Sequence, residues 1–228
     1  MIRIDGFSEV FGSKSDIAKG YLDVNPAEIM TDQDMANYIS KEFDEAHNVV
    51  EFDTYEKLMS EVFDLSEDEI DIDFTPDEKL ITLLEHFKPD MWESMDEIER
   101  KDAVNVLATA IGEALELDSM PDIIIEEGDD SYGLYDYKNN IIVLNSGYFS
   151  EPMELVNTIA HELRHAYQHM RADLLETRND ALYKVNFDNY ISPVPIPGGG
   201  WLFFMDYYDQ YVEVDARAFS HKFMEAMA

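Results

Sequence analysis

The stretch His161-Glu162-Leu163-Arg164-His165 constrains this chain more than any other feature, because it reads H-E-x-x-H in a segment of helical periodicity. Two histidines four residues apart on a helix project from the same face, so their imidazoles can bind one zinc ion. Glu162 can reach a water molecule on that metal and take its proton. The motif therefore predicts His161 and His165 as zinc ligands and Glu162 as the general base.

The flanking residues predict an amphipathic helix over about 151–175. Ser150 is a suitable N-cap, Pro152 fits the first turn, and acidic residues lie near the positive end of the helix dipole. An apolar stripe then runs through Leu155, Val156, Ile159, Ala160, Leu163 and Ala166, with Tyr167 and Met170 beyond it. This context favours a zinc site over a chance match between solvated histidines.

A hydrolytic zinc site needs a third protein ligand and an open position. The H-E-x-x-H-x-x-G-x-x-H solution is excluded, since Gln168 replaces its glycine and Arg171 its third histidine. His169 lies one turn beyond His165, but a third residue on the same helix reaches the same metal poorly.

A glutamate from a later helix is the other common solution, and Glu213 fits it. Glu213 lies beside a core-facing helical stripe in which the small residue Ala216 leaves room for the motif helix. The other members of that stripe are Val212, Phe219 and Phe223. Further candidates for the third ligand are Asp209, Asp215 and His221.

These segments together resemble the ImmA/IrrE-like zinc metallopeptidases, which are gluzincin-type HExxH enzymes. The resemblance rests on Ile142-Val143-Leu144-Asn145, on the motif itself, and on Glu213-x-x-Ala216-x-x-Phe219-Ser220, with Ser220 where the family pattern has alanine. It spans about residues 123–220 and implies His161, His165 and Glu213 as ligands of Zn²⁺ and Glu162 as the base. The family often carries a helix-turn-helix module before the peptidase domain, and the acidity of the N-terminal half argues against one here.

The second unusual feature is a formal net charge of −34 over 228 residues. Residues 1–120 hold 32 of the 50 acidic residues and a net charge of −23, which leaves −11 for residues 121–228. Such a surface repels phosphate backbones, so direct nucleic-acid binding is not expected, whereas basic substrates or partners are attracted. Solubility or adaptation to salt is the simpler explanation of the charge and is the one we favour.

Other compositional features narrow the setting of the protein. The chain has no cysteine, which fits a reducing cytoplasm. It shows neither a signal peptide at its start nor an apolar stretch of membrane-spanning length. We therefore expect a cytoplasmic protein without a membrane partner, and the sequence leaves its oligomeric state open.

The periodicities predict an α+β protein in two parts. Residues 1–120 form an acidic, mainly helical region, with helices over about 31–46 and 54–65, from Thr75 to Phe87, and from Ser94 to Leu117. Residues 121–228 form a zincin-like domain, in which strands at 123–125, 132–137 and 141–145 make a small antiparallel or mixed sheet on the motif helix. Either of the last two strands could bind a substrate backbone as an added strand. The Pro- and Gly-rich segment 192–201 is either a lid or a plain connection.

The predicted activity is zinc-dependent hydrolysis of peptide bonds in a protein substrate, with water activated by Glu162. Tyr211 is our candidate donor to the developing oxyanion, and Tyr208, Arg217 and His221 are alternatives. A different class of function is an acidic interaction protein, such as a DNA mimic that binds a basic partner on a zincin scaffold. A zinc hydrolase that acts on something other than peptides is a third option.

Overall fold

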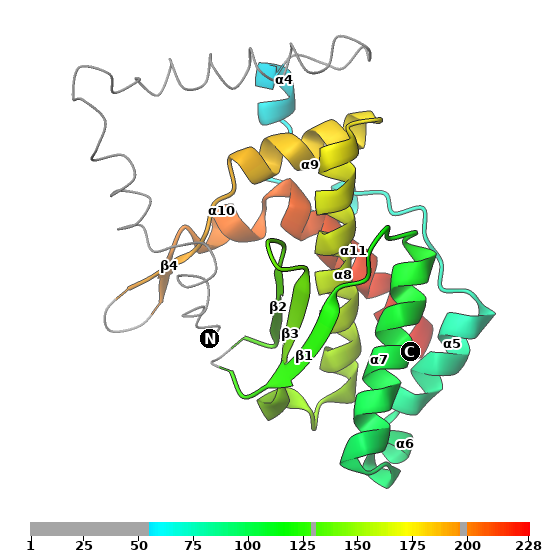
Figure 1. The fold of residues 1–228 in the computed structure, drawn as a ribbon. Helices are drawn as coiled ribbons and strands as arrows, with labels where there is room; N and C mark the ends of the chain where they lie inside the picture. The colour runs from blue at the N-terminus through cyan, green and yellow to red at the C-terminus, as the bar shows by residue number, and fades with distance from the viewer. Residues whose placement is uncertain (1–54, 129–130, 197–199) are drawn as a thin grey trace.

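The computed structural model describes residues 55–128, 131–196 and 200–228, without the side chains of Glu56 and Asp68. It is a mostly helical α+β fold in which a small mixed sheet of three strands packs against the helix that carries His161 and His165 (Figure 1). This confirms the predicted fold class. The helix predicted over 31–46 lies outside the described residues.

The sheet comprises β1 (Asp122–Glu126), β2 (Gly133–Asp136) and β3 (Ile141–Asn145) in the order β1-β3-β2. Strand β1 pairs with β3 in parallel, and β2 pairs with it antiparallel. The Asp136 side chain accepts hydrogen bonds from the backbone N–H groups of Lys138 and Asn139, which closes the turn between β2 and β3. Strand β3 is therefore central, and β2 leaves one edge open beside the motif helix.

The motif helix is α8 (Pro152–Leu174), and it ends at Leu175 in the left-handed conformation with φ 52°. It contacts β2, β3 and the helices α7, α9 and α11. The approach of β2 to α8 requires a glycine at position 133, since a Cβ there would lie 2.7 Å from Thr158 Cγ2 and 2.8 Å from the Val143 carbonyl oxygen. Predicted bounds of 151–175 are thus correct to within one residue at each end.

After α8 the chain forms α9 (Arg178–Asp188), which sequence analysis did not predict, and reaches α11 (Tyr211–Met227), the predicted helix of Glu213. Between them lie the two-residue strands β4 (Val194–Pro195) and β5 (Trp201–Leu202) and the short helix α10 (Phe204–Tyr208). This connection carries the Pro- and Gly-rich segment, and β4 and β5 pair with each other in antiparallel fashion.

Elements on the N-terminal side of the sheet are short, apart from one helix. They are α4 (Tyr55–Met59), η2 (Glu67–Glu69), α5 (Glu78–Leu84), η3 (Glu85–Phe87), α6 (Pro89–Ser94) and α7 (Glu97–Ala114); a further turn, η4 (Ser146–Tyr148), follows β3. Asp77 and Asp96 cap α5 and α7 through hydrogen bonds to backbone N–H groups. The helices predicted from Thr75 and Ser94 are therefore present, and the one predicted over 54–65 is confined to α4.

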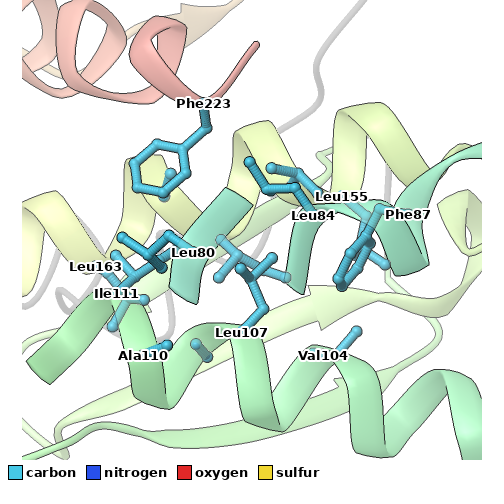
Figure 2. Close-up of a cluster of buried hydrophobic side chains, with 14 of the residues drawn as sticks. Leu80, Leu84, Phe87, Val104, Leu107, Ala110, Ile111, Leu155, Leu163 and Phe223 are labelled. Atoms are coloured by element: carbon cyan, nitrogen blue, oxygen red, sulfur yellow. The ribbon is translucent and has the colours of Figure 1, made fainter. Parts of the chain in front are cut away.

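Residues from both sides of position 120 share the main hydrophobic cluster. Figure 2 shows Leu80 and Leu84 of α5, Leu107 of α7, Leu163 of α8 and Phe223 of α11 in this one cluster. A second cluster joins α4, α9 and the start of α11. The division into domains at residue 120 stays a prediction, but the two sequence regions are joined by a common core. In the described part of the chain, no helix is long and apolar enough to cross a membrane.

Candidate metal centre

Three side chains converge where α8 faces α11. The Nε2 atoms of His161 and His165 lie 3.1 Å apart, and the carboxylate of Glu213 lies 3.5 Å from the first and 3.6 Å from the second. One ligand atom from each of these three residues lies within 4.8 Å of the other two. The two imidazoles and the carboxylate therefore form a group that could hold one metal ion.

The spacing of these atoms matches the demands of a tetrahedral ion. With metal–nitrogen and metal–oxygen bonds of about 2.0–2.2 Å, two ligand atoms of a tetrahedron lie roughly 3.3–3.6 Å apart. The observed separations of 3.1, 3.5 and 3.6 Å are close to that edge length. Two imidazoles and one carboxylate also suit zinc, although other divalent transition metals accept the same donors.

Glu213 is held as a buried anion. Its side chain is only 2% exposed, and burial alone would raise the pKa of its carboxyl group. Nearby His165, His161 and a hydrogen bond from Tyr190 outweigh burial and bring that pKa down to about 2. The Tyr190 hydroxyl donates to Glu213 Oε1 at 2.6 Å, and the Tyr207 hydroxyl faces the same carboxylate. Glu213 is thus ionised, as a metal ligand must be.

Glu162 follows His161 on α8, and its side chain is 8% exposed. Burial raises the pKa of its carboxyl group to about 7, and the charge of Glu213 adds to that rise. The charge of His165 and a hydrogen bond from the Tyr135 backbone N–H act in the opposite direction. A carboxyl group with a pKa near neutrality is suited to accept and return a proton.

The open edge of β2 runs beside this centre. The Tyr132 carbonyl oxygen accepts from the Asn145 N–H at 2.9 Å, so alternate residues of the strand face β3, and the backbone groups of Gly133 and Tyr135 face outward. The outward Tyr135 N–H is the group that donates to Glu162. Since β3 is central, β2 is the one of these two predicted strands that has a free edge.

A cleft of about 780 Å³ surrounds these groups. Its walls include β2, the end of α9 and helix α10, and its aromatic lining includes Tyr135, Phe187, Tyr190, Phe204 and Tyr207. The Pro- and Gly-rich connection therefore leads directly into a wall of the cleft, because α10 follows β5.

Two of the other predicted candidates lie away from the centre. Tyr211, predicted as the oxyanion donor, packs against Tyr183 in the second hydrophobic cluster and does not line the cleft. The physical reason is that residues two apart on a helix point about 200° from each other, so Tyr211 and Glu213 face different sides of α11. His221 pairs with Glu67 at 2.9 Å.

The remaining candidates have other partners, although Tyr208 and Arg217 line the cleft. Asp215 binds Arg164, while Arg217 binds Glu67 and lies over the ring of Tyr208. Asp209 uses its backbone carbonyl to accept from the Leu65 N–H and is not part of the metal group.

His169 lines the cleft but is not part of the metal group. Its ring is stacked between Phe187, with centroids 3.8 Å apart, and Tyr137, with centroids 4.7 Å apart. Burial, and then the charge of His165, lower the pKa of His169 to about 3. His169 is therefore a neutral aromatic wall, in agreement with the expectation that it reaches the metal poorly.

Sequence reasoning missed three residues at the centre, namely Gln168, Tyr190 and Tyr207. Gln168 accepts a hydrogen bond from His165 Nδ1 at 2.8 Å. The signal in the sequence is the spacing, because residues three positions apart on a helix are neighbours on its surface. No local pattern marks the two tyrosines, because they come from the connection between α9 and α11.

No protein-family model matches this chain, and comparisons with curated proteins and with solved structures find no significant match. The likeness to ImmA/IrrE-like peptidases therefore rests on the motif residues and their placement. What the fold and the site define is an α+β protein with a candidate His-His-Glu metal centre in an aromatic cleft.

Proposed function

We propose that this protein is a zinc-dependent metallopeptidase that hydrolyses peptide bonds of a protein substrate. The observation that carries the proposal is the convergence of His161, His165 and Glu213, with ligand atoms within 4.8 Å, beside the buried carboxyl group of Glu162. The two components that such hydrolysis needs, a metal site and a general base of suitable pKa, lie in the same cleft.

The proton chemistry belongs to Glu162. A zinc ion at this site would supply Lewis-acid chemistry, polarising a carbonyl oxygen and making a water molecule more acidic. With its pKa near 7, Glu162 accepts a proton from the attacking water and later returns it to the leaving amine. The hydrogen bond from Tyr135 N–H holds the carboxyl group in place during both transfers.

The edge of β2 supplies the main-chain contacts for an extended substrate. Gly133 presents its N–H and C=O groups outward, and an added strand would use them. A substrate bound there runs past Glu162, because Tyr135 of the same edge is bonded to that carboxyl group.

The charges of the cleft favour basic substrates. Its two cationic side chains are both engaged: Lys184 pairs with Asp188 at 2.6 Å and Arg217 with Glu67 at 2.9 Å. Exposed carboxylates of Glu126 and Asp173 line the same cleft. Basic residues that flank the cleaved bond would therefore be attracted.

Tyr207 is the hydroxyl group we assign to the developing oxyanion. Tyr190 is already committed to Glu213 Oε1 at 2.6 Å. Tyr207 also contacts that carboxylate, and its ring lies 6.2 Å from that of Tyr190 in an edge-on arrangement. Burial, and then the charge of Glu213, raise the pKa of Tyr207 well above its usual value, so its hydroxyl group stays protonated and able to donate.

The test compares the wild type with Glu162→Gln and His161→Ala. Zinc content is measured by atomic emission, and cleavage is followed by mass spectrometry on a denatured, lysine-rich protein mixture. We expect Glu162→Gln to keep the metal and lose cleavage, and His161→Ala to lose both. Equal cleavage by Glu162→Gln and wild type would refute the mechanism. A metal-loaded wild type that cleaves nothing, yet binds a basic protein in a salt-sensitive way, would favour the acidic interaction protein instead.

A further inference from the structure

Gln168 is a buried amide that joins the metal centre to α11. Its side chain is 0% exposed, and its Oε1 lies 2.8 Å from His165 Nδ1. Its Nε2 donates to the Val212 carbonyl oxygen at 2.9 Å and to Asp215 Oδ2 at 2.7 Å. Every polar atom of this amide therefore has a partner.

The direction of these bonds fixes the proton on His165. Both partners of Gln168 Nε2 are oxygens that only accept, so the NH₂ group must face them and Oε1 must face His165. Because Oε1 only accepts, His165 carries its proton on Nδ1. In the neutral ring, Nε2 then carries the lone pair, and it points toward His161 and Glu213, where a metal ligand needs it.

Asp215 holds Gln168 in this orientation. Its Oδ1 accepts from Arg164 Nη2 at 2.9 Å and from Tyr183 at 3.2 Å, while its Oδ2 accepts from Arg164 Nε and Gln168 Nε2, both at 2.7 Å. The carboxylate is 2% exposed and is bound by four donors, so it is unable to rotate freely. A rigid acceptor thus lies next to Gln168.

We propose that Gln168 and Asp215 are positioning residues of the metal centre: Asp215 orients the Gln168 amide, and that amide fixes the tautomer and ring orientation of His165. The inference rests on the metal site of the proposed function but not on peptidase activity. It requires a side chain at position 168 that accepts a hydrogen bond from His165 and donates to Asp215 and to the Val212 carbonyl oxygen. A glutamate there could accept from His165, but its second oxygen would face Asp215 Oδ2 and the Val212 carbonyl oxygen.

The chain contains a matched control for Asp215. Asp180 is also 2% exposed and also binds an arginine of α8 through two bonds, from Arg171 Nε at 2.9 Å and from Arg171 Nη2 at 2.7 Å. Asp180 caps the start of α9 and lies outside the metal group. Asp180→Asn therefore weakens a buried ion pair of the same kind without a route to His165.

The experiment measures zinc affinity by competition with a chromogenic chelator for wild type, Gln168→Met, Asp215→Asn and Asp180→Asn. Urea unfolding of the metal-free proteins gives their stabilities. Loss of a partner behind a metal ligand typically weakens binding about 10–100-fold. We expect that loss for Gln168→Met and Asp215→Asn, and a change of less than about 3-fold for Asp180→Asn even if its stability falls as much. Equal weakening in all three variants, or unchanged affinity in Gln168→Met, would overturn the proposal.

A second measurement reads the tautomer directly. In long-range ¹H–¹⁵N spectra of the metal-free wild type, His165 should show protonated Nδ1 and unprotonated Nε2, and the wild type remains testable even if a variant does not fold. An Nε2–H tautomer of His165 would refute the inference. A wild type that shows the Nδ1–H tautomer but binds no zinc would instead count against the proposed function.

Discussion

The Tyr190 hydroxyl donates a 2.6 Å hydrogen bond to Oε1 of Glu213, the same oxygen that lies 3.6 Å from His165 Nε2. Tyr190 follows α9, and Glu213 lies in the first turn of α11, so one bond ties two elements of the cleft to the candidate metal centre. Carboxylate ligands of metals are commonly oriented by such outer partners.

Replacing Tyr190 with phenylalanine should weaken zinc binding. The substitution removes the donor to Glu213 Oε1 but keeps the ring against Tyr207, so the carboxylate becomes freer to rotate away from the two histidines. We expect about a 10-fold loss of affinity, measured by chelator competition. Tyr208→Phe is the control, because Tyr208 lines the cleft but contacts Arg217 rather than Glu213. Equal affinities in Tyr190→Phe and wild type would contradict this role.

Tyr207→Phe should affect turnover more than metal binding. Loss of a single donor to an oxyanion typically lowers kcat by about 10²–10³-fold. We therefore expect a drop of that order in kcat, with KM and zinc content changed by less than about 5-fold. Steady-state kinetics on a cleaved peptide measure both constants. A variant in which KM rises and kcat is retained would show that Tyr207 binds substrate instead.

The carboxyl group of Glu162 should make the metal-free protein less stable as pH rises. In the unfolded chain this group loses its proton near its usual pKa of 4.5, whereas in the folded protein burial keeps the proton until about pH 7. Stability from this group is present below pH 4.5, declines between pH 4.5 and 7, and is absent above that range. A shift of this size corresponds to on the order of 3 kcal/mol.

Glu162→Gln removes that titration, so the variant should be more stable than wild type at pH 8 and nearly equal to it at pH 4.5. Urea unfolding with chelator present measures the free energy of unfolding at each pH. Parallel pH profiles for the two proteins would show that the Glu162 pKa is not raised in the folded state.

Gly133→Ala should destabilise the fold by roughly 1–3 kcal/mol. The new Cβ would lie 2.7 Å from Thr158 Cγ2 and 2.8 Å from the Val143 carbonyl oxygen, so β2 must move away from α8. Gly128→Ala is the matched control, since its Cβ would come no closer than 3.4 Å to any atom, which is ordinary contact. Thermal unfolding of the metal-free proteins measures both, and adding Thr158→Ser should restore part of the loss. Equal melting temperatures for the two alanine variants would contradict the close approach of β2 to α8.

Local patterns were sufficient for the elements that carry the ligands. Helix α8 buries one stripe that includes Leu155, Ile159 and Leu163, and the apolar spacing in the sequence follows that stripe. The three strands were also visible, because Ile142 and Leu144 alternate with less buried neighbours in the central strand. The candidate metal group followed from the same periodicities, since they placed His161, His165 and Glu213 on helices of known phase.

Helix α9 was not predicted from the sequence because it lacks a single apolar stripe. It contacts α4, α8 and α11, and the consecutive residues Ala181, Leu182 and Tyr183 are all buried. A helix that is covered on several sides has no polar face to reveal its period. The capping box between Thr177 and Asp180 was the available signal.

The surroundings of the ligands were out of reach for a different reason. Gln168, Tyr190 and Tyr207 act through distances set by the packing of α8, α9, α10 and α11. Tyr211 was predicted as the oxyanion donor partly because it lies close to Glu213 along the chain, but its ring packs against Tyr183. Which tyrosine reaches a given carboxylate depends on tertiary contacts that no window of sequence contains.

The common core across residue 120 has a practical consequence for dissecting this protein. A fragment that starts at residue 121 would leave Leu163, Phe219 and Phe223 without the leucines of α5 and α7 that cover them. Such a fragment should aggregate because these apolar side chains would be exposed. The packing that holds α8, and with it His161 and His165, in position would also be lost. A fragment made to study the candidate metal centre should therefore include the acidic region at least from Tyr55 onward, because α4 covers α9 and the start of α11.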